Sequence, residues 1–171
     1  MLALLHLDLD HFNAINNTSG YAAADALLQA VAARLAAHVR AGDLLARVGG
    51  DEFALILEDV ASREAAAAVG RKLLKALATP ISVGPEPLCI AASIGIAFHP
   101  VDGETADDLI RAADQAIHAA KHCGGNRLAS FSGLLDAILG PAAARVRPAV
   151  AVQLRPVLYP AAEIVVDSAV A

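Results

Sequence analysis

The sequence is poor in cysteine and has no long uninterrupted apolar segment. Its two cysteines, Cys89 and Cys123, lie far apart and outside any C-x-x-C pattern, which argues against a disulfide framework and a cysteine-based zinc site. No run of about 18 uncharged apolar residues occurs, and the N-terminal segment lacks the basic region and cleavage site of a signal peptide. We therefore expect a cytoplasmic setting and no direct membrane contact in this segment.

Positive charge is also scarce. The chain has 13 Lys and Arg against 18 Asp and Glu, giving a formal net charge of −5, and its pI is near 5.6. A nucleic-acid backbone requires a concentrated basic face, and the sequence has none, so nucleic acid is not an expected partner. A small anionic ligand held through a metal ion remains open.

The length and the hydrophobic content indicate one domain with a tail. With 171 residues, 57% of them hydrophobic, the chain is long enough for one full core and too short for two ordinary domains. After Ser132, prolines interrupt a stretch rich in Val and Ala that has no clear helical or strand period. We expect a domain over residues 1–132 and a linker and tail over residues 133–171.

Apolar periodicity predicts the secondary structure of the domain. Strands are predicted over residues 2–9, 43–48, 53–57, 88–98 and 127–131, and helices over residues 22–39, 62–77 and from Thr105 to the pair Gly124-Gly125. Gly49-Gly50 predicts a hairpin turn that needs positive φ. The order β-α-β-β-α-β-α-β predicts an α/β fold, namely a ferredoxin-like or palm-like α+β sandwich with a mostly antiparallel sheet flanked by helices.

Acidic residues follow two of the predicted strands. Asp8 and Asp10 stand at the end of the first strand, where we expect one to face a site and the other to turn away, and Asp51-Glu52 stands on the hairpin. Carboxylates from adjacent strands can share a hard cation, and oxygen ligands without clustered histidine or cysteine favour Mg²⁺. The alternative is that these are ordinary strand-end and turn acids, and spacing does not decide between the two.

The acidic residues belong to a longer ordered series of motifs. The series runs through Leu7-Asp8-Leu9-Asp10-His11-Phe12, Ile15-Asn16, Gly20, Asp25, Arg47-Val48-Gly49-Gly50-Asp51-Glu52-Phe53, Ser93-Ile94-Gly95-Ile96-Ala97, Ala113-Asp114-Gln115-Ala116 and Ala120-Lys121. Over roughly residues 2–131 it resembles the GGDEF family of nucleotidyl cyclases, whose usual reaction joins two GTP molecules into the bacterial second messenger cyclic di-GMP. The resemblance implies a diguanylate cyclase with the nucleotidyl cyclase fold.

The resemblance implies roles for the acids. Asp8 and Asp51 would bind Mg²⁺, or Mn²⁺ in its place, together with the carbonyl of Leu9. Asp51 would also favour loss of the ribose 3′-hydroxyl proton, and Glu52 would support the metal and the 3′-end. The 3′-hydroxyl of one GTP would then attack the α-phosphate of the other.

The resemblance also implies a nucleotide site. Backbone N–H groups of His11 and Phe12, and the ammonium of Lys121, would hold phosphates. Asn16 and Asp25 would read guanine, because an acid accepts from its N1–H and exocyclic amine. Each domain would hold one GTP, so catalysis would require a homodimer.

A product-inhibition site is implied next to the signature. Arg40 and Asp43 stand where the family often carries an R-x-x-D motif, and Arg71 stands where a second arginine is often found. Guanidinium groups suit the guanine edges and phosphates of cyclic di-GMP. Alternatively, Arg40 neutralises a helix C-terminus and Asp43 caps a turn.

The sequence departs from the family at two phosphate-binding positions. Asn13 replaces the usual lysine of the first motif, and Gly125 replaces the usual arginine after the last helix. The tail over residues 152–166 faintly resembles the start of an EAL phosphodiesterase domain. These features favour an alternative function: a catalytically degenerate domain that binds GTP and regulates a cyclic di-GMP phosphodiesterase.

Overall fold

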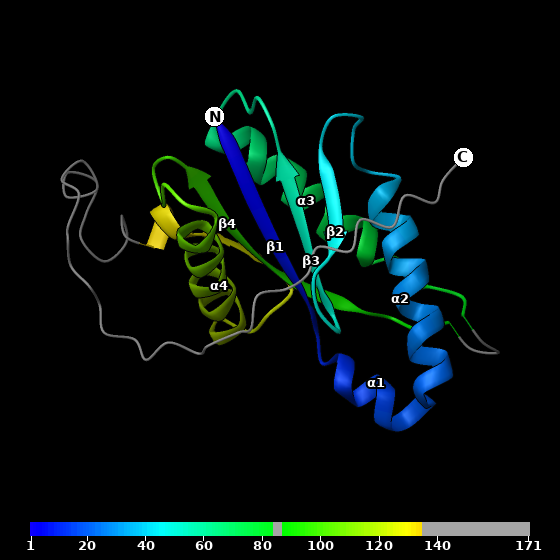
Figure 1. Ribbon diagram of the computed structural model, residues 1–171. Helices are drawn as coiled ribbons and strands as arrows, with labels where there is room; N and C mark the ends of the chain where they lie inside the picture. The colour runs from blue at the N-terminus through cyan, green and yellow to red at the C-terminus, as the bar shows by residue number, and fades with distance from the viewer. Residues whose placement is uncertain (84–86, 135–171) are drawn as a thin grey trace.

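The computed structural model describes residues 1–83 and 87–134 and contains a five-stranded sheet flanked by helices (Figure 1). The strands follow the order β2-β3-β1-β4-β5 across the sheet. The elements along the chain are β1 (Leu2–Asp10), α1 (Phe12–Ser19), α2 (Tyr21–Ala36), β2 (Leu44–Arg47), β3 (Glu52–Leu57), α3 (Arg63–Leu77), β4 (Ala91–His99), α4 (Ala106–His122) and β5 (Leu128–Ser130). The predicted tail lies outside the described residues from residue 135 onward, and so does the segment compared with an EAL domain.

The central strand β1 explains the nearly continuous apolar run at the start of the chain. It pairs antiparallel with β3 on one side and with β4 on the other, and helices cover both of its faces. A strand buried on both faces cannot alternate between apolar and polar residues. The sheet is antiparallel except at β5, which runs parallel to β4, so the predicted fold class is confirmed.

The two faces of the sheet build two apolar layers. Leu5 and Leu7 pack in one cluster with α2 and α3, which includes Leu27 and Leu73, whereas Leu4 packs in a second cluster with α4. Side chains two residues apart in a strand share a face, so the remaining even-numbered residues of β1 also lie under α4. This placement puts three polar side chains of β1, at positions 6, 8 and 10, on the α4 face.

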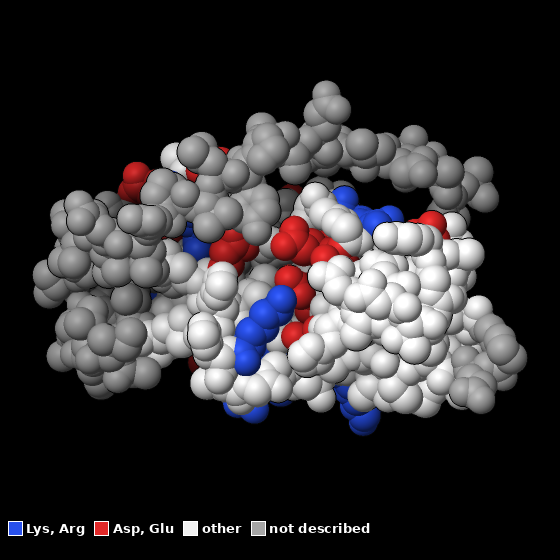
Figure 2. Space-filling model, turned by 90° about the horizontal axis from the view of Figure 1, so that it is seen from below, with Lys and Arg blue, Asp and Glu red and all other residues white. Residues whose placement is uncertain are grey.

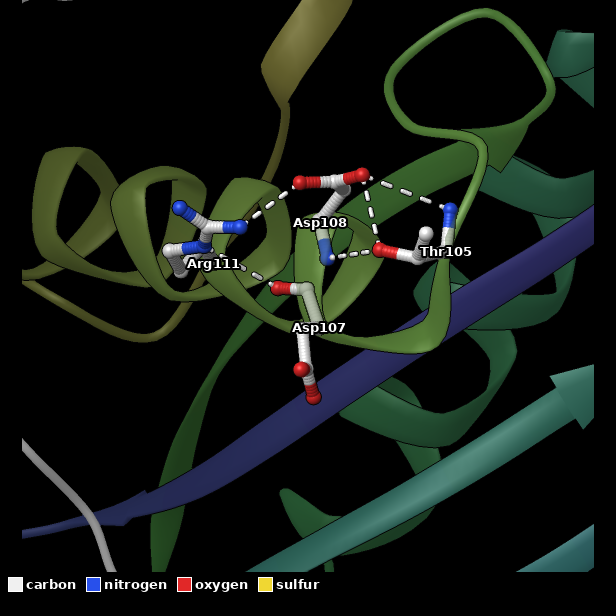
Figure 3. Close-up of polar contacts among 4 residues, drawn as sticks. All are labelled: Thr105, Asp107, Asp108 and Arg111. Atoms are coloured by element: carbon white, nitrogen blue, oxygen red, sulfur yellow. Dashed lines mark hydrogen bonds and ion pairs between the residues drawn. The ribbon is translucent and has the colours of Figure 1, made fainter.

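Helix α4 is closely seated on β4 and firmly capped. A Cβ at Gly95 would lie 2.0 Å from the carbonyl oxygen of Ala113, so glycine is required for this approach. At its N-terminus, Thr105 and Asp108 form the predicted capping box, and Arg111 pairs with Asp108 at 2.6 Å (Figure 3). The rotation of α4, and therefore the direction of its inner face, is well defined.

Two predictions about the first half of the domain are wrong. The sequence predicts no helix before Gly20, yet α1 forms there. Its sequence is mostly polar and it buries only Phe12, so it has no helical apolar stripe that would indicate it. Gly20, with φ 81°, separates α1 from α2. The sequence predicts positive φ in the diglycine turn, but neither Gly49 nor Gly50 adopts it.

Among the described residues, no helix has both the length and the apolar character needed to cross a bilayer.

Candidate active site

The C-terminal end of β1 delivers its acids to one face of the sheet. Asp8 pairs with Lys121 of α4, and Asp10 accepts a hydrogen bond from the backbone N–H of Asn126, just after α4. Both carboxylates therefore lie on the α4 side, and the expectation that one of them turns away is wrong. The physical reason is the two-residue period of a strand, which places positions i and i+2 on the same face.

Asp8 is held in an ion pair. Nζ of Lys121 lies 2.6 Å from Oδ1 of Asp8, and the Asp8 side chain is 15% exposed. The same Oδ1 atom is buried and has no hydrogen bond of normal geometry, so the contact with Lys121 is close but poorly aligned. Seen from below, this end of the molecule gathers acidic side chains beside a basic one (Figure 2).

The β2–β3 turn brings the second pair of acids to Asp8. Glu52 is the residue opposite Asp8 in the β1–β3 ladder, and the backbone N–H of Leu9 donates to the carbonyl of Asp51 at 3.1 Å. Arg47 closes the turn by donating from its guanidinium to the carbonyls of Gly49 and Gly50. The signature residues thus lie at the end of β1, as the resemblance implied.

The acids at this end repel one another. Burial, followed by the charge of Asp8, raises the pKa of Asp51. Burial also raises the pKa of Glu52; His6 opposes this rise, whereas Asp8 adds to it. A bound cation would relieve this repulsion.

The donor set fits a hard divalent ion. The described residues contain no group of three His, Cys, Asp or Glu side chains gathered to hold a metal, but the implied ligands are two carboxylates and a backbone carbonyl. The buried Oδ1 of Asp8, without a well-aligned hydrogen bond, is the atom that such an ion would satisfy. Asp8, Leu9 and Asp51 could therefore hold Mg²⁺.

The residues implied for the nucleotide lie around α1 and α2. His11 adopts a left-handed conformation, with φ 60° and ψ 23°, at the junction of β1 and α1, and no side chain caps the first N–H groups of this helix. Phe12 is buried beneath them. Asn16 lies on α1, and Asp25 is exposed on α2.

Sequence reasoning missed the role of Asp10. Its carboxylate accepts from the hydroxyl of Ser93 at 2.8 Å and from the backbone N–H of Asn126 at 2.8 Å, so it anchors the loop after α4 to β1. In that loop Gly125 has φ 69°, and a Cβ there would lie 3.0 Å from Oδ2 of Asp10. The positive φ and the nearby Asp10 carboxylate therefore both favour glycine at position 125, where the family usually has arginine.

A second missed feature is the pair formed by His6 and Asp114. Nδ1 of His6 lies 2.6 Å from Oδ1 of Asp114, so β1 and α4 are joined a second time beside the ion pair of Asp8. The scattered histidines gave no ligand spacing in the sequence. The signal that could have found this pair was the position of His6, two residues before Asp8 on a predicted strand.

Two of the three residues implied for the product site are paired with each other. Nε of Arg40 donates to Asp43 at 2.9 Å, and Asp43 also accepts from the backbone N–H of Glu58. Arg71 is exposed on α3, and the adjacent Lys72 donates to the carbonyl of His38 at 3.3 Å, which ties α3 to the segment just before Arg40.

The fold and the site define a class of palm-like α/β domain with acidic side chains at the ends of two neighbouring antiparallel strands. Residues 1–127 match the model of the family described as "Diguanylate cyclase, GGDEF domain". The chain belongs to the GGDEF domain family.

The chain is similar to larger signalling proteins of Pseudomonas aeruginosa. The chain is 42% identical over 137 residues to the bifunctional diguanylate cyclase/cyclic di-GMP phosphodiesterase MucR of Pseudomonas aeruginosa, covering 79% of this chain and 20% of that protein. It is 37% identical to the cyclic di-GMP phosphodiesterase NbdA of the same organism, covering 77% of this chain and 17% of that protein. The chain therefore spans about a fifth of these relatives.

The fold matches solved GGDEF structures. An EAL/GGDEF domain protein from M. capsulatus superposes with a TM-score of 0.72 at 42% identity, covering 76% of this chain and 84% of that chain. The GGDEF domain of TpbB, also called YfiN, from Pseudomonas aeruginosa superposes with a TM-score of 0.74 at 34% identity, covering 81% of each chain.

Proposed function

We propose that this domain is a diguanylate cyclase that condenses two GTP molecules into cyclic di-GMP, in cytoplasmic bacterial second-messenger signalling. The observation that carries the proposal is the convergence of Asp8, Asp51 and Lys121 at one end of the sheet in a member of the GGDEF family. These are the groups that a metal-bound triphosphate requires.

The acidic residues and Lys121 have separate roles in the proposed reaction. Asp8, Asp51 and the carbonyl of Leu9 would hold Mg²⁺ or Mn²⁺, which would supply positive charge to align the phosphates and offset their developing charge. Asp51 favours loss of the 3′-hydroxyl proton, and Glu52 supports that end of the site. Lys121 is paired with Asp8, so its ammonium lies at the metal end of the site, where it would contact a phosphate.

The nucleotide contacts explain both selectivity and the need for two chains. Asn16 and Asp25 read guanine, while backbone N–H groups of His11 and Phe12 cradle phosphates. Each domain holds one GTP, so the reaction proceeds in a homodimer whose sites face each other. Cyclic di-GMP is the product, and it also inhibits by binding at a second site.

That second site consists of Arg40, Asp43 and Arg71. The pairing of Arg40 with Asp43 orients the guanidinium, and the hydrogen bond from Lys72 to the carbonyl of His38 joins the helix that carries Arg71 to the segment before Arg40. Arginine suits both the guanine edge and the phosphates of a cyclic dinucleotide.

The experiment is incubation of the purified chain, at a concentration that favours dimers, with GTP and Mg²⁺, followed by chromatography for cyclic di-GMP. We expect product from the natural sequence and none from Asp51→Ala. Asp107→Ala, which removes an exposed acid at the opposite end of α4, is the matched control and should retain activity. Equal activity in Asp51→Ala and the natural sequence would exclude the assigned role of Asp51.

A second candidate is a GTP-binding regulatory module without turnover. Asn13 and Gly125 remove two expected phosphate contacts, each worth about 1.5–3 kcal/mol, and the relative NbdA is described as a phosphodiesterase. GTP binding measured by calorimetry, without product in the same sample, would favour this candidate over the cyclase.

A further inference from the structure

Arg127 stands at the same end of the sheet as the acids, and on the same face. Its carbonyl accepts from the backbone N–H of Ile94 at 2.9 Å, where the β4–β5 ladder begins. The next residue, Leu128, packs on the cluster of α2 and α3, so the side chain of Arg127 belongs to the α4 face. The ladders place Arg127 level with Ser93, which lies opposite Asp8. Two strand spacings, about 10 Å, therefore separate Arg127 from Asp8.

The main chain around Arg127 is fixed. Gly124, Gly125 and Asn126 all have positive φ, at 104°, 69° and 49°, and reverse the chain directly after α4. The backbone N–H of Asn126 then donates to the carboxylate of Asp10 at 2.8 Å. The next residue enters the ladder with β4, so Arg127 is held against two strands on a short, tied loop.

The guanidinium of Arg127 folds back over the end of α4. Its Nε donates to the carbonyl of Gly125 at 3.1 Å, and its Nη2 lies 3.7 Å from the position that a Cβ on Gly124 would take. The backbone N–H of Gly124 donates to the carbonyl of Lys121 at 2.9 Å. The guanidinium therefore lies against the turn that carries the ammonium of Lys121.

Most of the hydrogen-bonding capacity of Arg127 is unused. The side chain is exposed and forms no ion pair with a carboxylate in residues 1–83 or 87–134. Nε supplies the hydrogen bond to Gly125, so the two terminal nitrogens keep their N–H groups. Those groups form a planar fork that matches two oxygens of a phosphate.

We propose that Arg127 binds the triphosphate of GTP and supplies the positive charge that Gly125 lacks. The arginine usual in the family stands at position 125, where positive φ and the carboxylate of Asp10 disfavour a side chain in this chain. Arg127 brings a guanidinium back over that position from two residues further along. The inference rests on the proposed function only in requiring that GTP binds at this end of the sheet.

The alternative role of Arg127 is to neutralise the carbonyl groups at the C-terminus of α4. This role predicts that loss of the charge lowers the stability of the domain and leaves the affinity for GTP unchanged. Nucleotide affinity and thermal stability, measured on the same variant, therefore separate the two roles.

The test measures binding of α,β-methylene GTP to the full chain by calorimetry with saturating Mg²⁺. This analogue cannot release pyrophosphate, so binding is measured without turnover. Arg127→Gln keeps an N–H donor at the place of Nε for the carbonyl of Gly125 and removes the terminal N–H groups. We expect about 10- to 150-fold weaker binding, the effect of losing one charge-assisted phosphate contact, and nearly the same melting temperature.

The matched control is Arg111→Gln. Arg111 is 69% exposed and pairs with Asp108 at the opposite end of α4 (Figure 3), so the variant changes the net charge equally and far from the site. It should keep the natural affinity within about twofold, because solvent screens the distant charge. Unchanged affinity in Arg127→Gln, an equal loss in the control, or no binding by the natural sequence would each overturn the proposal.

A second measurement needs no variant. The Nε–H signal of Arg127, assigned by NMR in the natural sequence, should shift when the analogue is added and stay in place with guanosine, which has no phosphate. A signal that does not respond to the analogue would overturn the proposal even if Arg127→Gln failed to melt cooperatively.

The result can be told apart from that of the cyclase assay. Cyclic di-GMP formation together with unchanged affinity in Arg127→Gln would remove the role of Arg127 and leave the proposed function intact. Weaker binding in Arg127→Gln, without product from the natural sequence, would keep Arg127 as a phosphate ligand and exclude turnover.

Discussion

Replacing Lys121 with methionine should change metal binding and nucleotide binding in opposite directions. In the structure Lys121 acts as the cation at Asp8, with Nζ 2.6 Å from Oδ1. A metal ion that binds without nucleotide must compete with this ammonium. A triphosphate, in contrast, would gain the ammonium as a partner once the metal has displaced it. Methionine keeps much of the apolar stem and removes the charge.

The two magnitudes follow from the exposure of the pair. The Lys121 side chain is 41% exposed and that of Asp8 is 15% exposed, so we assign the pair about 0.5–1 kcal/mol, the upper part of the range for exposed ion pairs. Removing this competitor should tighten nucleotide-free metal binding about two- to fivefold. Losing a charge-assisted phosphate contact of about 1.5–3 kcal/mol should weaken GTP binding about 10- to 150-fold.

The assay measures Mn²⁺ binding without nucleotide by electron paramagnetic resonance and GTP binding with saturating metal by calorimetry. Lys75→Met is the matched control, because Lys75 is exposed on α3 and its loss changes the net charge equally. It should leave both affinities within about twofold. If Lys121→Met weakens metal binding or leaves it unchanged, Lys121 does not compete for Asp8 and the reasoning is refuted.

Two further predictions concern stability. Because the native state raises the pKa of Asp51 and Glu52, it holds their protons more tightly than the unfolded chain. Their contribution to the free energy of unfolding should therefore fall as pH rises from the ordinary carboxyl range through the raised pKa values. Urea unfolding across this window should show a shallower fall in Asp51→Asn than in the natural sequence, and an equal fall would contradict the assigned repulsion. Separately, Gly125→Ala should cost about 1–2 kcal/mol, because φ is 69° and the new Cβ would lie 3.0 Å from Asp10. Gly50→Ala, where nothing lies within 4 Å of the new Cβ, is the control and should change stability by less than about 0.5 kcal/mol. If Gly125→Ala costs no more than Gly50→Ala, the loop after α4 adjusts to the new Cβ and the prediction is wrong.

Much of the fold could be predicted because its elements have clear local signals. The strand at the start of the chain is an apolar run bounded by acids, and α3 and α4 have amphipathic stripes with side-chain caps at Ser62 and Thr105. These signals come from residues that are close together in the sequence, so the sequence alone is enough to predict these elements. Helix α1 lacks them, since it is short and polar, and its place is fixed by the buried ring of Phe12 and by the corner at Gly20.

The candidate site was predicted less completely, because its remaining parts depend on long-range contacts. The motif order was enough to expect Asp8 and Asp51 at one end of the sheet. The pairing of His6 with Asp114 joins residues 108 positions apart. It depends on the register of α4 against β1, which Gly95 sets by admitting the helix backbone. Neither residue stands out in the sequence until that register is known.

The loop after α4 bears directly on whether the domain turns over GTP. The carboxylate of Asp10 accepts from the backbone N–H of Asn126 and lies 3.0 Å from the position that a Cβ at residue 125 would take. The positive φ at position 125 and the nearby buried carboxylate both disfavour a side chain there. Gly125→Arg alone would therefore strain the backbone, even though the new arginine could contact a phosphate. Of the three cations expected from the resemblance, Lys121 remains, and it is paired with Asp8, a carboxylate that a metal ion would also bind. Metal binding should thus raise the affinity for GTP more in this domain than in one that keeps all three cations, because here the metal also releases the remaining cation.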